Sequence, residues 1–504
     1  MSQKKAGVIL SYVNTVITSL MNILFVPLFI SHLGAAEYGV YKIINSFAGY
    51  LLIMDFGIGT IVTRYVSLYN SKGDIRQRNR CVATSVIVSM MLVTIVMIIG
   101  LTLKTQINNI YKNSMTTEQL ALAHDLYLMM IINIALSMIC HLFSGYVNAY
   151  ERFIVSNALA TGRLMLRIII ILALLFTGHT ARLIIATDLF LTAALLIIYM
   201  LYCFTKLDMK INLKQFDKSL LVGYFMFSGA VLLQSVVNQV NNSVDNMILG
   251  VMSSPEVVTM YSSGMTIYGL YVALPQTVAN VFLPQATRLF GEKLPDDDGT
   301  KLTDFVVRPG RYEAMICMAI LIGFTLLGKD FIALWIGNEY SDAWMVALLL
   351  MVPFTIPLCE NVMITILNAQ NKRMFRSVVL FGVAGLNVLL TVFLVGRVGF
   401  IGAAIGTCVS VILGHGIVIN IYYVKKFKLR LWYMCKALFK GILPCAIAVF
   451  VLCIPLYFWE TSGWIGLAAK ASVFGILYAG ILYRFGLNTE EKSVVGVLLS
   501  FFKR

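Results

Sequence analysis

Fourteen apolar stretches, each long enough to cross a lipid bilayer as a helix, follow one another along the chain. A membrane-spanning helix needs about 20 mainly apolar residues, whereas a membrane β-barrel shows alternating strands of roughly 10 residues. The sequence therefore predicts an all-α polytopic membrane protein with about 14 transmembrane helices. The expected spans are 8–30, 39–68, 81–103, 122–148, 154–177, 183–205, 219–250, 255–286, 305–328, 343–369, 376–396, 401–424, 433–456 and 463–484.

The charged residues are few and unevenly placed. They make up 12% of the 504 residues, against about 25% in an ordinary soluble domain, which excludes a soluble enzyme, a secreted scaffold and a disordered protein. With the N-terminus placed in the cytoplasm, 28 Lys and Arg fall in inside segments and 5 in outside segments. This asymmetry predicts a multi-pass membrane protein with both termini cytoplasmic. It also explains the net charge of +15 without nucleic acid.

The two halves of the chain resemble each other weakly. Asn14 and Asn22 of the first stretch recur as Asn238 and Asn246 of the seventh, at a shift of 224 residues. Six helices separate the copies, so both halves have the same orientation and are related by a pseudo-two-fold axis along the membrane normal. We therefore predict two six-helix lobes plus two C-terminal helices. The expected parts are an N-lobe at 1–205, a cytoplasmic linker at 206–218, a C-lobe at 219–424, two helices at 425–486 and a cytoplasmic amphipathic tail at 487–504.

Ionisable side chains within the expected spans are candidates for function. Each one costs at least ~2.5–3.5 kcal/mol at the bilayer centre, so it needs a partner or a wet cavity. The candidates are Lys42, Asp55, Arg64, Arg167, Asp188, Asp245, Glu360 and Lys470. Arg64 near the inner interface and Lys42 near the outer one have snorkelling as an alternative role.

Polar side chains also form stripes along one face of two helices. In hydrocarbon such a stripe must face protein or water. Because both halves carry one, we interpret the stripes as walls of a hydrophilic cavity, with interhelical packing as the alternative. The stripe of the first span includes Asn14, Thr18 and Asn22, and that of the seventh includes Gln234, Asn238, Asn242 and Asp245. The tyrosines Tyr41, Tyr50, Tyr261, Tyr268 and Tyr271 are candidates for stacking on sugars, although core or interface packing is favoured.

Several kinds of chemistry have no motif in the sequence. The nine cysteines show neither a disulfide pattern nor zinc-ligand spacing, and the five histidines lie far apart. The sequence has no Walker A, HExxH, Gly-x-Ser-x-Gly or dinucleotide-binding motif. We therefore expect no enzyme activity, no metal and no cofactor, and transport that draws on an ion gradient or on the substrate gradient.

Two segments resemble a known family. Residues 27–41 read PLFISHLGAAEYGVY, and residues 399–407 read GFIGAAIGT. The first is similar to the first loop, and the second to the Gly-rich twelfth helix, of Wzx-type polysaccharide flippases in the multidrug/oligosaccharidyl-lipid/polysaccharide (MOP) superfamily. The resemblance implies a V-shaped pair of lobes around a central cavity that opens alternately to either side. It also implies lipid-linked oligosaccharides as the cargo and the bacterial cytoplasmic (inner) membrane as the location.

The expected function is therefore that of a flippase. It would move a polyprenyl-diphosphate-linked oligosaccharide, an O-antigen or capsule-type repeat unit of lipopolysaccharide or polysaccharide biosynthesis, from the inner to the outer leaflet. Arg64, Arg167 and Lys42 would offset the diphosphate charge, and Asn14, Thr18, Asn22, Gln234, Asn238 and Asn242 would contact the glycan. Asp55, Asp188, Asp245 and Glu360 are candidates for coupling to H⁺ or Na⁺, or for pairing with those cations. The expected partners are membrane lipids and other polysaccharide-assembly proteins, with the chain as a monomer.

Three alternatives stay open at this point. A multidrug or cation antiporter of the same superfamily predicts an acidic, aromatic pocket, whereas these spans also hold cations. A peptidoglycan-precursor flippase is a close neighbour in function. A membrane polysaccharide polymerase ranks lowest, because such enzymes present a sizeable outer loop and the longest one expected here is about 104–121.

Overall fold

The computed structural model describes residues 3–177, 180–290, 298–370, 373–459 and 463–502. Within these ranges every regular element is a helix and no strand occurs, so the predicted all-α class is confirmed. Eleven helices are long and apolar enough to cross a membrane, or up to twelve if one bent pair counts as a single span. The chain is a multi-pass membrane protein.

Each predicted span coincides with one helix or with consecutive helices, but the number fourteen is not confirmed. The stretches at 8–30 and 219–250 lie on helices whose side chains are described only in part, and these helices are not among the eleven. The stretch at 433–456 is the bent pair, with an angle of 43° between its two helices.

The contacts divide the described chain into two compact units, residues 1–262 and 263–504. The predicted lobes, with their linker at 206–218, stay a prediction. The elements of unit 1 are α1 (Gln3–Leu33), α2 (Ala35–Leu52), the 3-10 turn η1 (Ile53–Asp55), α3 (Ile58–Ser71), α4 (Ile75–Tyr111), α5 (Thr117–Ala149), α6 (Phe153–Phe176), α7 (Ala181–Lys206), η2 (Leu213–Gln215), α8 (Lys218–Met252) and the start of α9 (Pro255–Phe290).

Unit 2 contains the rest of α9 and all later elements. These are α10 (Thr300–Trp335), η3 (Asn338–Tyr340), α11 (Ala343–Cys359), α12 (Asn361–Ala369), α13 (Arg373–Val398), α14 (Ile401–Val411), the π-helix η4 (Ile412–Ile419), α15 (Asn420–Phe427), α16 (Leu431–Phe439), α17 (Ile442–Phe458), α18 (Gly463–Ile481), the π-helix η5 (Leu482–Gly486) and α19 (Thr489–Phe502).

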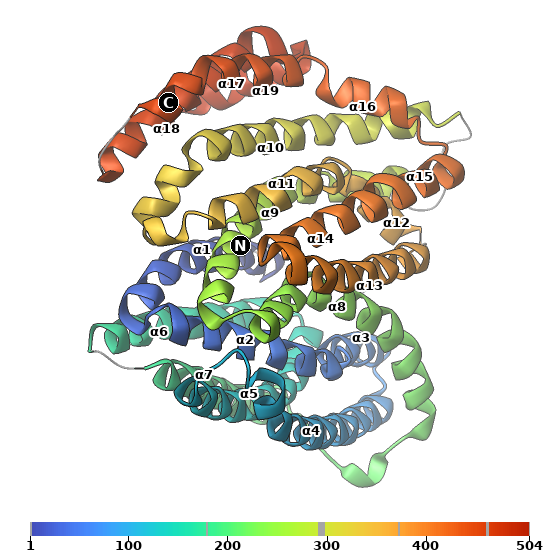
Figure 1. The fold of residues 1–504 in the computed structure, drawn as a ribbon. Helices are drawn as coiled ribbons and strands as arrows, with labels where there is room; N and C mark the ends of the chain where they lie inside the picture. Colours follow the sequence, from blue (N-terminus) through green and yellow to red (C-terminus); the bar gives the residue numbers. More distant parts are fainter. Residues whose placement is uncertain (1–2, 178–179, 291–297, 371–372, 460–462, 503–504) are drawn as a thin grey trace. The chain divides into compact units, whose positions relative to one another are not determined.

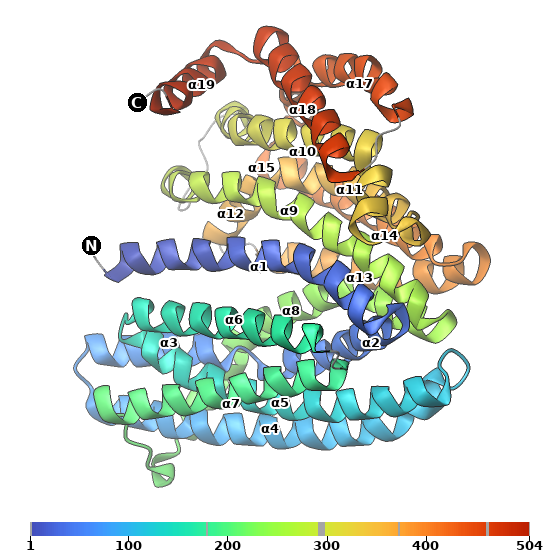
Figure 2. The same ribbon diagram turned by 90° about the vertical axis from the view of Figure 1, so that its left-hand side faces the viewer.

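Unit 1 is built around α5. Figure 2 shows α4, α5 and α7 running side by side, and α5 also contacts α2 and α3. Small residues bring α3 and α5 together: a Cβ atom added at Gly145 would lie 2.3 Å from the Gly59 carbonyl oxygen. The Thr63 hydroxyl donates to the Gly145 carbonyl at 2.9 Å, and the Ser67 hydroxyl donates to the Ala149 carbonyl at 3.0 Å. Such close approach through small residues is how membrane helices gain packing energy.

The predicted span at 39–68 is broken inside unit 1. Helix α2 passes into η1, and the next two residues, Phe56 and Gly57, have left-handed φ angles of 53° and 68° before α3 begins. Glycine adopts this conformation at little cost, whereas it is uncommon for a bulky residue such as Phe56. The break places Asp55 at the end of η1, between α2 and α3.

In unit 2 the Gly-rich segment serves close packing. Helices α13 and α14 lie side by side (Figure 1), joined by a turn in which Gly399 has a φ of 71°. A Cβ atom added at Gly402 would lie 2.5 Å from the Leu394 backbone. Between the two helices the buried Asn387 side chain accepts hydrogen bonds from the Thr391 and Thr407 hydroxyls at 3.1 and 3.2 Å.

Candidate functional site

Two predicted site residues of unit 1 form one ion pair. The Arg167 guanidinium on α6 donates from Nε to Asp188 Oδ1 at 2.5 Å and from Nη2 to Oδ2 at 3.0 Å, with Asp188 on α7. A parallel, two-point contact of this kind fixes the orientation of both side chains.

A cavity of about 320 Å³ lies beside this pair, and we call it the unit 1 cavity. Helices α2, α5, α7 and α8 form its walls, and Asp188 is part of them. The lining residues are Tyr41, Asn45, Ala48, Gly49, Leu52, Met130, Asn133, Ile134, Ser137, Ile185, Asp188, Gln239 and Ser243. The walls therefore mix apolar side chains with amides, hydroxyls and one carboxylate.

The amides of this cavity are arranged to meet polar groups. Gln239 Nε2 donates to the Ser46 carbonyl at 3.3 Å and to the Ser243 hydroxyl at 2.9 Å. Asn133 Oδ1 is buried and has no hydrogen-bond partner among the residues that the structure describes. A buried amide oxygen without a donor is unfavourable, so Asn133 is suited to accept a hydrogen bond from a bound hydroxyl.

The other predicted cations lie outside this pair. Lys42 is half-buried, and its ammonium lies 5.3 Å from the centroid of the buried Tyr38 ring, within the range of a cation–π contact. Arg64 is exposed on α3. Lys470, on α18 of unit 2, is buried and donates to Asp330 Oδ2 of α10 at 2.6 Å.

The predicted glycan contacts fall into three groups. Thr18 and Asn22 of α1, and Asn238 and Asn242 of α8, are exposed. The side chains of Asn14 and Gln234 lie outside the described residues. The polar groups of α8 that line the unit 1 cavity are the neighbours Gln239 and Ser243, which the predicted stripe does not include.

Two members of the α8 stripe pair with adjacent helices. The Tyr261 hydroxyl of α9 donates to Asp245 Oδ2 at 2.6 Å. The Ser262 hydroxyl donates to Asn246 Oδ1 at 3.0 Å, and Asn246 Nδ2 donates to the Ser46 hydroxyl at 3.3 Å. These buried contacts join α8 to α2 and to the first residues of α9.

The acidic candidates Asp55 and Glu360 have different partners. Glu360 is buried where α11 meets α12, and Asn420 Nδ2 donates to its Oε1 at 3.0 Å. Asp55 Oδ2 lies 3.2 Å from His141 Nδ1 of α5. His141 was not among the predicted site residues; its signal is a lone histidine within the apolar run 138–143 of α5.

The sequence analysis also missed Glu313 on α10. This residue is 0% exposed, and neither carboxyl oxygen has a hydrogen-bond partner in the described part of the chain. Its signal was a single acidic residue inside the predicted span 305–328.

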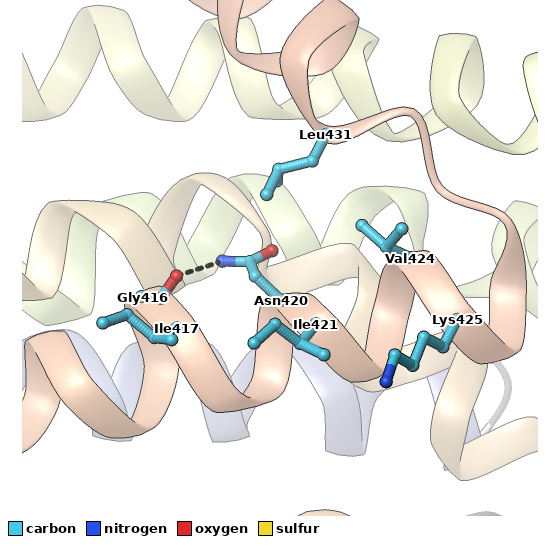
Figure 3. Close-up of a pocket in the computed structure, with 7 residues that line it drawn as sticks. All are labelled: Gly416, Ile417, Asn420, Ile421, Val424, Lys425 and Leu431. Carbon is cyan, nitrogen blue, oxygen red and sulfur yellow. Dashed lines mark hydrogen bonds between the residues drawn. The ribbon is translucent and has the colours of Figure 1, made fainter.

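Unit 2 has a groove of different character. It measures about 330 Å³ and is apolar apart from Asn420 and Lys425 (Figure 3). Its lining residues are Gly416, Ile417, Asn420, Ile421, Val424, Lys425 and Leu431. Asn420 Nδ2 is engaged with the Gly416 carbonyl at 3.4 Å as well as with Glu360. With so few polar groups, this groove is poorly suited to hold a sugar.

All nine cysteines are free, and seven of them are buried. Among the residues that the structure describes, no group of three or more His, Cys, Asp or Glu side chains could hold a metal ion.

Comparison with known proteins gives a family and a fold. A family model described as "Polysaccharide biosynthesis protein" matches residues 5–289, more than half of the chain. The probable flippase AglR of Haloferax volcanii is 30% identical over 175 residues, which are 34% of this chain and 36% of that protein. The match thus spans about a third of the length of this curated relative.

Two solved structures resemble most of the chain. One is the lipid II flippase MurJ in an inward closed conformation, with a TM-score of 0.73, 15% identity, and coverage of 95% of this chain and 98% of that one. The other is a multidrug resistance MATE family transporter of the MOP superfamily in an inward-facing conformation. Its TM-score is 0.64 at 15% identity, over 81% of this chain and 95% of that one. At this identity the likeness establishes the fold alone.

Proposed function

The chain belongs to the polysaccharide biosynthesis protein family, and from this premise we propose that it is a flippase for lipid-linked oligosaccharides. Its cargo is a polyprenyl-diphosphate-linked repeat unit of the O-antigen or capsule type. The protein carries this cargo from the inner to the outer leaflet of the cytoplasmic membrane by alternating access.

The observation that carries the proposal is the unit 1 cavity beside the Arg167–Asp188 pair. A guanidinium is suited to hold phosphate oxygens through parallel hydrogen bonds, as it holds Asp188 here. An arriving diphosphate competes with the Asp188 carboxylate for the same donors. The pair therefore keeps Arg167 oriented while the cavity is empty and releases it to an anion of higher charge.

The rest of the cavity suits the sugar next to the diphosphate. Its volume of about 320 Å³ is at the lower end of small-molecule sites, which span roughly 300–1,000 Å³. Asn45, Asn133 and Ser137 offer donors and acceptors to sugar hydroxyls, while Leu52 and Ile134 pack on the apolar face of a ring. The polyprenyl chain stays in the bilayer, so the protein has to enclose only the polar head group.

The test is flipping of a fluorescent lipid-diphosphate oligosaccharide by purified protein in liposomes. We expect Arg167→Ala to slow flipping by about 10-fold to 100-fold, the equivalent of a lost hydrogen bond to a charged group. Arg182→Ala is the matched control, because Arg182 also pairs with an aspartate, Asp125 at 2.8 Å, but at an exposed position. Equal rates of flipping by the wild type and Arg167→Ala would contradict the proposed role of the cavity.

The same liposomes separate the alternatives. A multidrug antiporter would move a cationic dye, although the guanidinium beside this cavity disfavours a cation. A peptidoglycan-precursor flippase would move lipid II faster than the oligosaccharide carrier. Transport of either competitor without transport of the lipid-linked oligosaccharide overturns the proposed cargo.

A further inference from the structure

Asp55 and His141 form an isolated carboxylate–imidazole pair in unit 1. Asp55 Oδ2 lies 3.2 Å from His141 Nδ1. The Asp55 side chain is 13% exposed, and its second oxygen, Oδ1, is buried without a hydrogen-bond partner among the described residues. The imidazole, in contrast, is 47% exposed. The Asp55 carboxylate is thus largely buried, whereas the His141 imidazole is partly exposed.

Packing of the backbone holds the two side chains at this distance. A Cβ atom added at Gly59 would lie 2.7 Å from the His141 carbonyl oxygen, so α3 touches α5 one turn after Asp55. The Thr63 hydroxyl then binds the Gly145 carbonyl one turn further along both helices. The pair therefore rests on a fixed helix contact and not on two freely rotating side chains.

Few other charges act on the pair. Residues 81–103 of α4 carry no charged side chain, and the nearest cation along α3 is the exposed Arg64.

The charged groups of the other neighbouring helices have partners of their own. Asp188 of α7 accepts a hydrogen bond from Arg167, and Asp245 of α8 accepts one from Tyr261. On α6, the Arg163 guanidinium donates to the Thr192 hydroxyl at 2.8 Å. On α2, Lys42 lies 13 residues before Asp55 and packs on Tyr38.

We propose that the Asp55–His141 pair binds the proton whose movement drives transport. This inference rests on the proposed flippase function and names its coupling ion and site. Imidazole exchanges a proton within the physiological pH range. With the proton bound, His141 is the counter-charge of Asp55. Once the proton leaves, the Asp55 carboxylate is buried beside a neutral ring with one oxygen unpartnered, which is an unfavourable state.

The helix break gives this unfavourable state a way to relax. Phe56 and Gly57 follow Asp55 with left-handed φ angles, at the junction of η1 and α3. Changes in a few backbone angles at such a junction reorient a helix segment. Loss of the proton thus favours an arrangement in which α2 and η1 turn and Asp55 reaches water. One proton is taken up from the outer side and released to the cytoplasm as the cargo moves outward, and no other reactant is needed.

The first test compares flipping with and without a pH gradient in liposomes. An inward gradient of about one pH unit corresponds to a tenfold ratio of proton concentrations. We therefore expect this gradient to raise the ratio of outer-leaflet to inner-leaflet cargo by up to about tenfold in the wild type. His141→Gln and Asp55→Asn keep the size of each side chain and should lose this stimulation while retaining flipping down the cargo gradient. A sodium gradient should have no effect.

His124→Gln is the matched control. His124 lies on the same helix and binds a neutral side chain, Asn108 Oδ1, at 2.8 Å. Its replacement should leave the pH stimulation intact. Full stimulation in His141→Gln, or its loss in His124→Gln as well, overturns the proposal.

A second measurement does not depend on the cargo. Infrared difference spectra of the purified protein between about pH 5 and 8, the range in which imidazole titrates, should contain linked imidazole and carboxylate bands. Both bands should vanish in His141→Gln and in Asp55→Asn. If wild type moves no oligosaccharide but shows these bands, the proposed function fails and the proton site stands. If wild type flips the cargo without these bands, the proton site fails alone.

Discussion

The Arg167 guanidinium and the Asp188 carboxylate face each other through two parallel hydrogen bonds, at 2.5 and 3.0 Å, between α6 and α7. Their side chains are 25% and 16% exposed. A largely buried pair is stable only while both partners are present, because a lone charge at such a site is strongly unfavourable. The same pair borders the unit 1 cavity. The contribution of the pair to stability can therefore be distinguished from its role in transport by replacing one partner or both partners.

We expect Asp188→Asn to lower the free energy of unfolding by about 2–3 kcal/mol, somewhat less than for a fully buried pair because water still reaches both groups. The double variant Arg167→Met/Asp188→Leu should recover most of this loss, since apolar side chains can replace a buried ion pair. It should nevertheless fail to flip the cargo. Unfolding in detergent and flipping in liposomes measure the two effects. A double variant that flips normally would contradict a role of the pair in transport.

Arg311 and Glu491 anchor the C-terminal helix of unit 2. Arg311 donates to both Glu491 carboxyl oxygens, at 2.6 and 3.1 Å, and to the carbonyls of Ala437, Lys440 and Gly486. Both side chains are less than a tenth exposed. We expect Glu491→Ala to destabilise the protein by about 3–5 kcal/mol, because it leaves Arg311 buried without its counter-charge. Thermal unfolding and amide hydrogen exchange of α19 provide the measurement.

The neighbouring pair is the control for this prediction. Arg308 and Glu490 lie 3.5 Å apart, but their side chains are 55% and 71% exposed. Exposed pairs contribute about 0–1 kcal/mol, so Glu490→Ala should have little effect. If both variants increase the amide hydrogen exchange of α19 equally, α19 is anchored by the carbonyl contacts of Arg311 and not by its ion pair.

The apolar stretches predicted the helices because membrane thickness sets a minimum length that composition alone reveals. The breaks inside spans were harder to predict, since the turn at Phe56 and Gly57 depends on packing between helices distant in sequence. Asp188 and Arg167 were both candidates from their depth, but their pairing follows from the contact of α6 with α7. The predicted roles of these residues in binding and coupling stay predictions.

His141 and Glu313 illustrate what the sequence does not reveal. No motif links His141 to Asp55, which precedes it by 86 residues, and only the α3–α5 contact brings them together. Glu313 lies in a predicted span, two residues after Arg311 and five after Arg308. In the structure Arg311 turns to Glu491 instead, and Glu313 is left without a partner.

The α3–α5 contact should be sensitive to one methyl group. A Cβ atom at Gly145 would lie 2.3 Å from the Gly59 carbonyl, so Gly145→Ala must separate the two helices. We expect a loss of about 1–3 kcal/mol, the usual cost of overpacking, measured by thermal unfolding. Gly162→Ala is the control, because nothing lies within 4 Å of its Cβ position on α6. Alanine there should be neutral or stabilise the helix by up to about 1 kcal/mol.

Replacing Glu313 should have the opposite effect and raise the stability of the protein. Its carboxyl group is 0% exposed and makes no hydrogen bond, so it is desolvated without compensation. Methionine has a similar length and no polar group, and Glu313→Met should therefore raise the free energy of unfolding by about 1–3 kcal/mol. The exposed Glu339 of η3 is the control, since Glu339→Met should change stability by less than about 0.5 kcal/mol. Chemical unfolding in detergent measures both variants. A clear destabilisation by Glu313→Met would mean that the carboxyl group is paired in the folded protein, and a loss of flipping at unchanged stability would place Glu313 in the transport cycle.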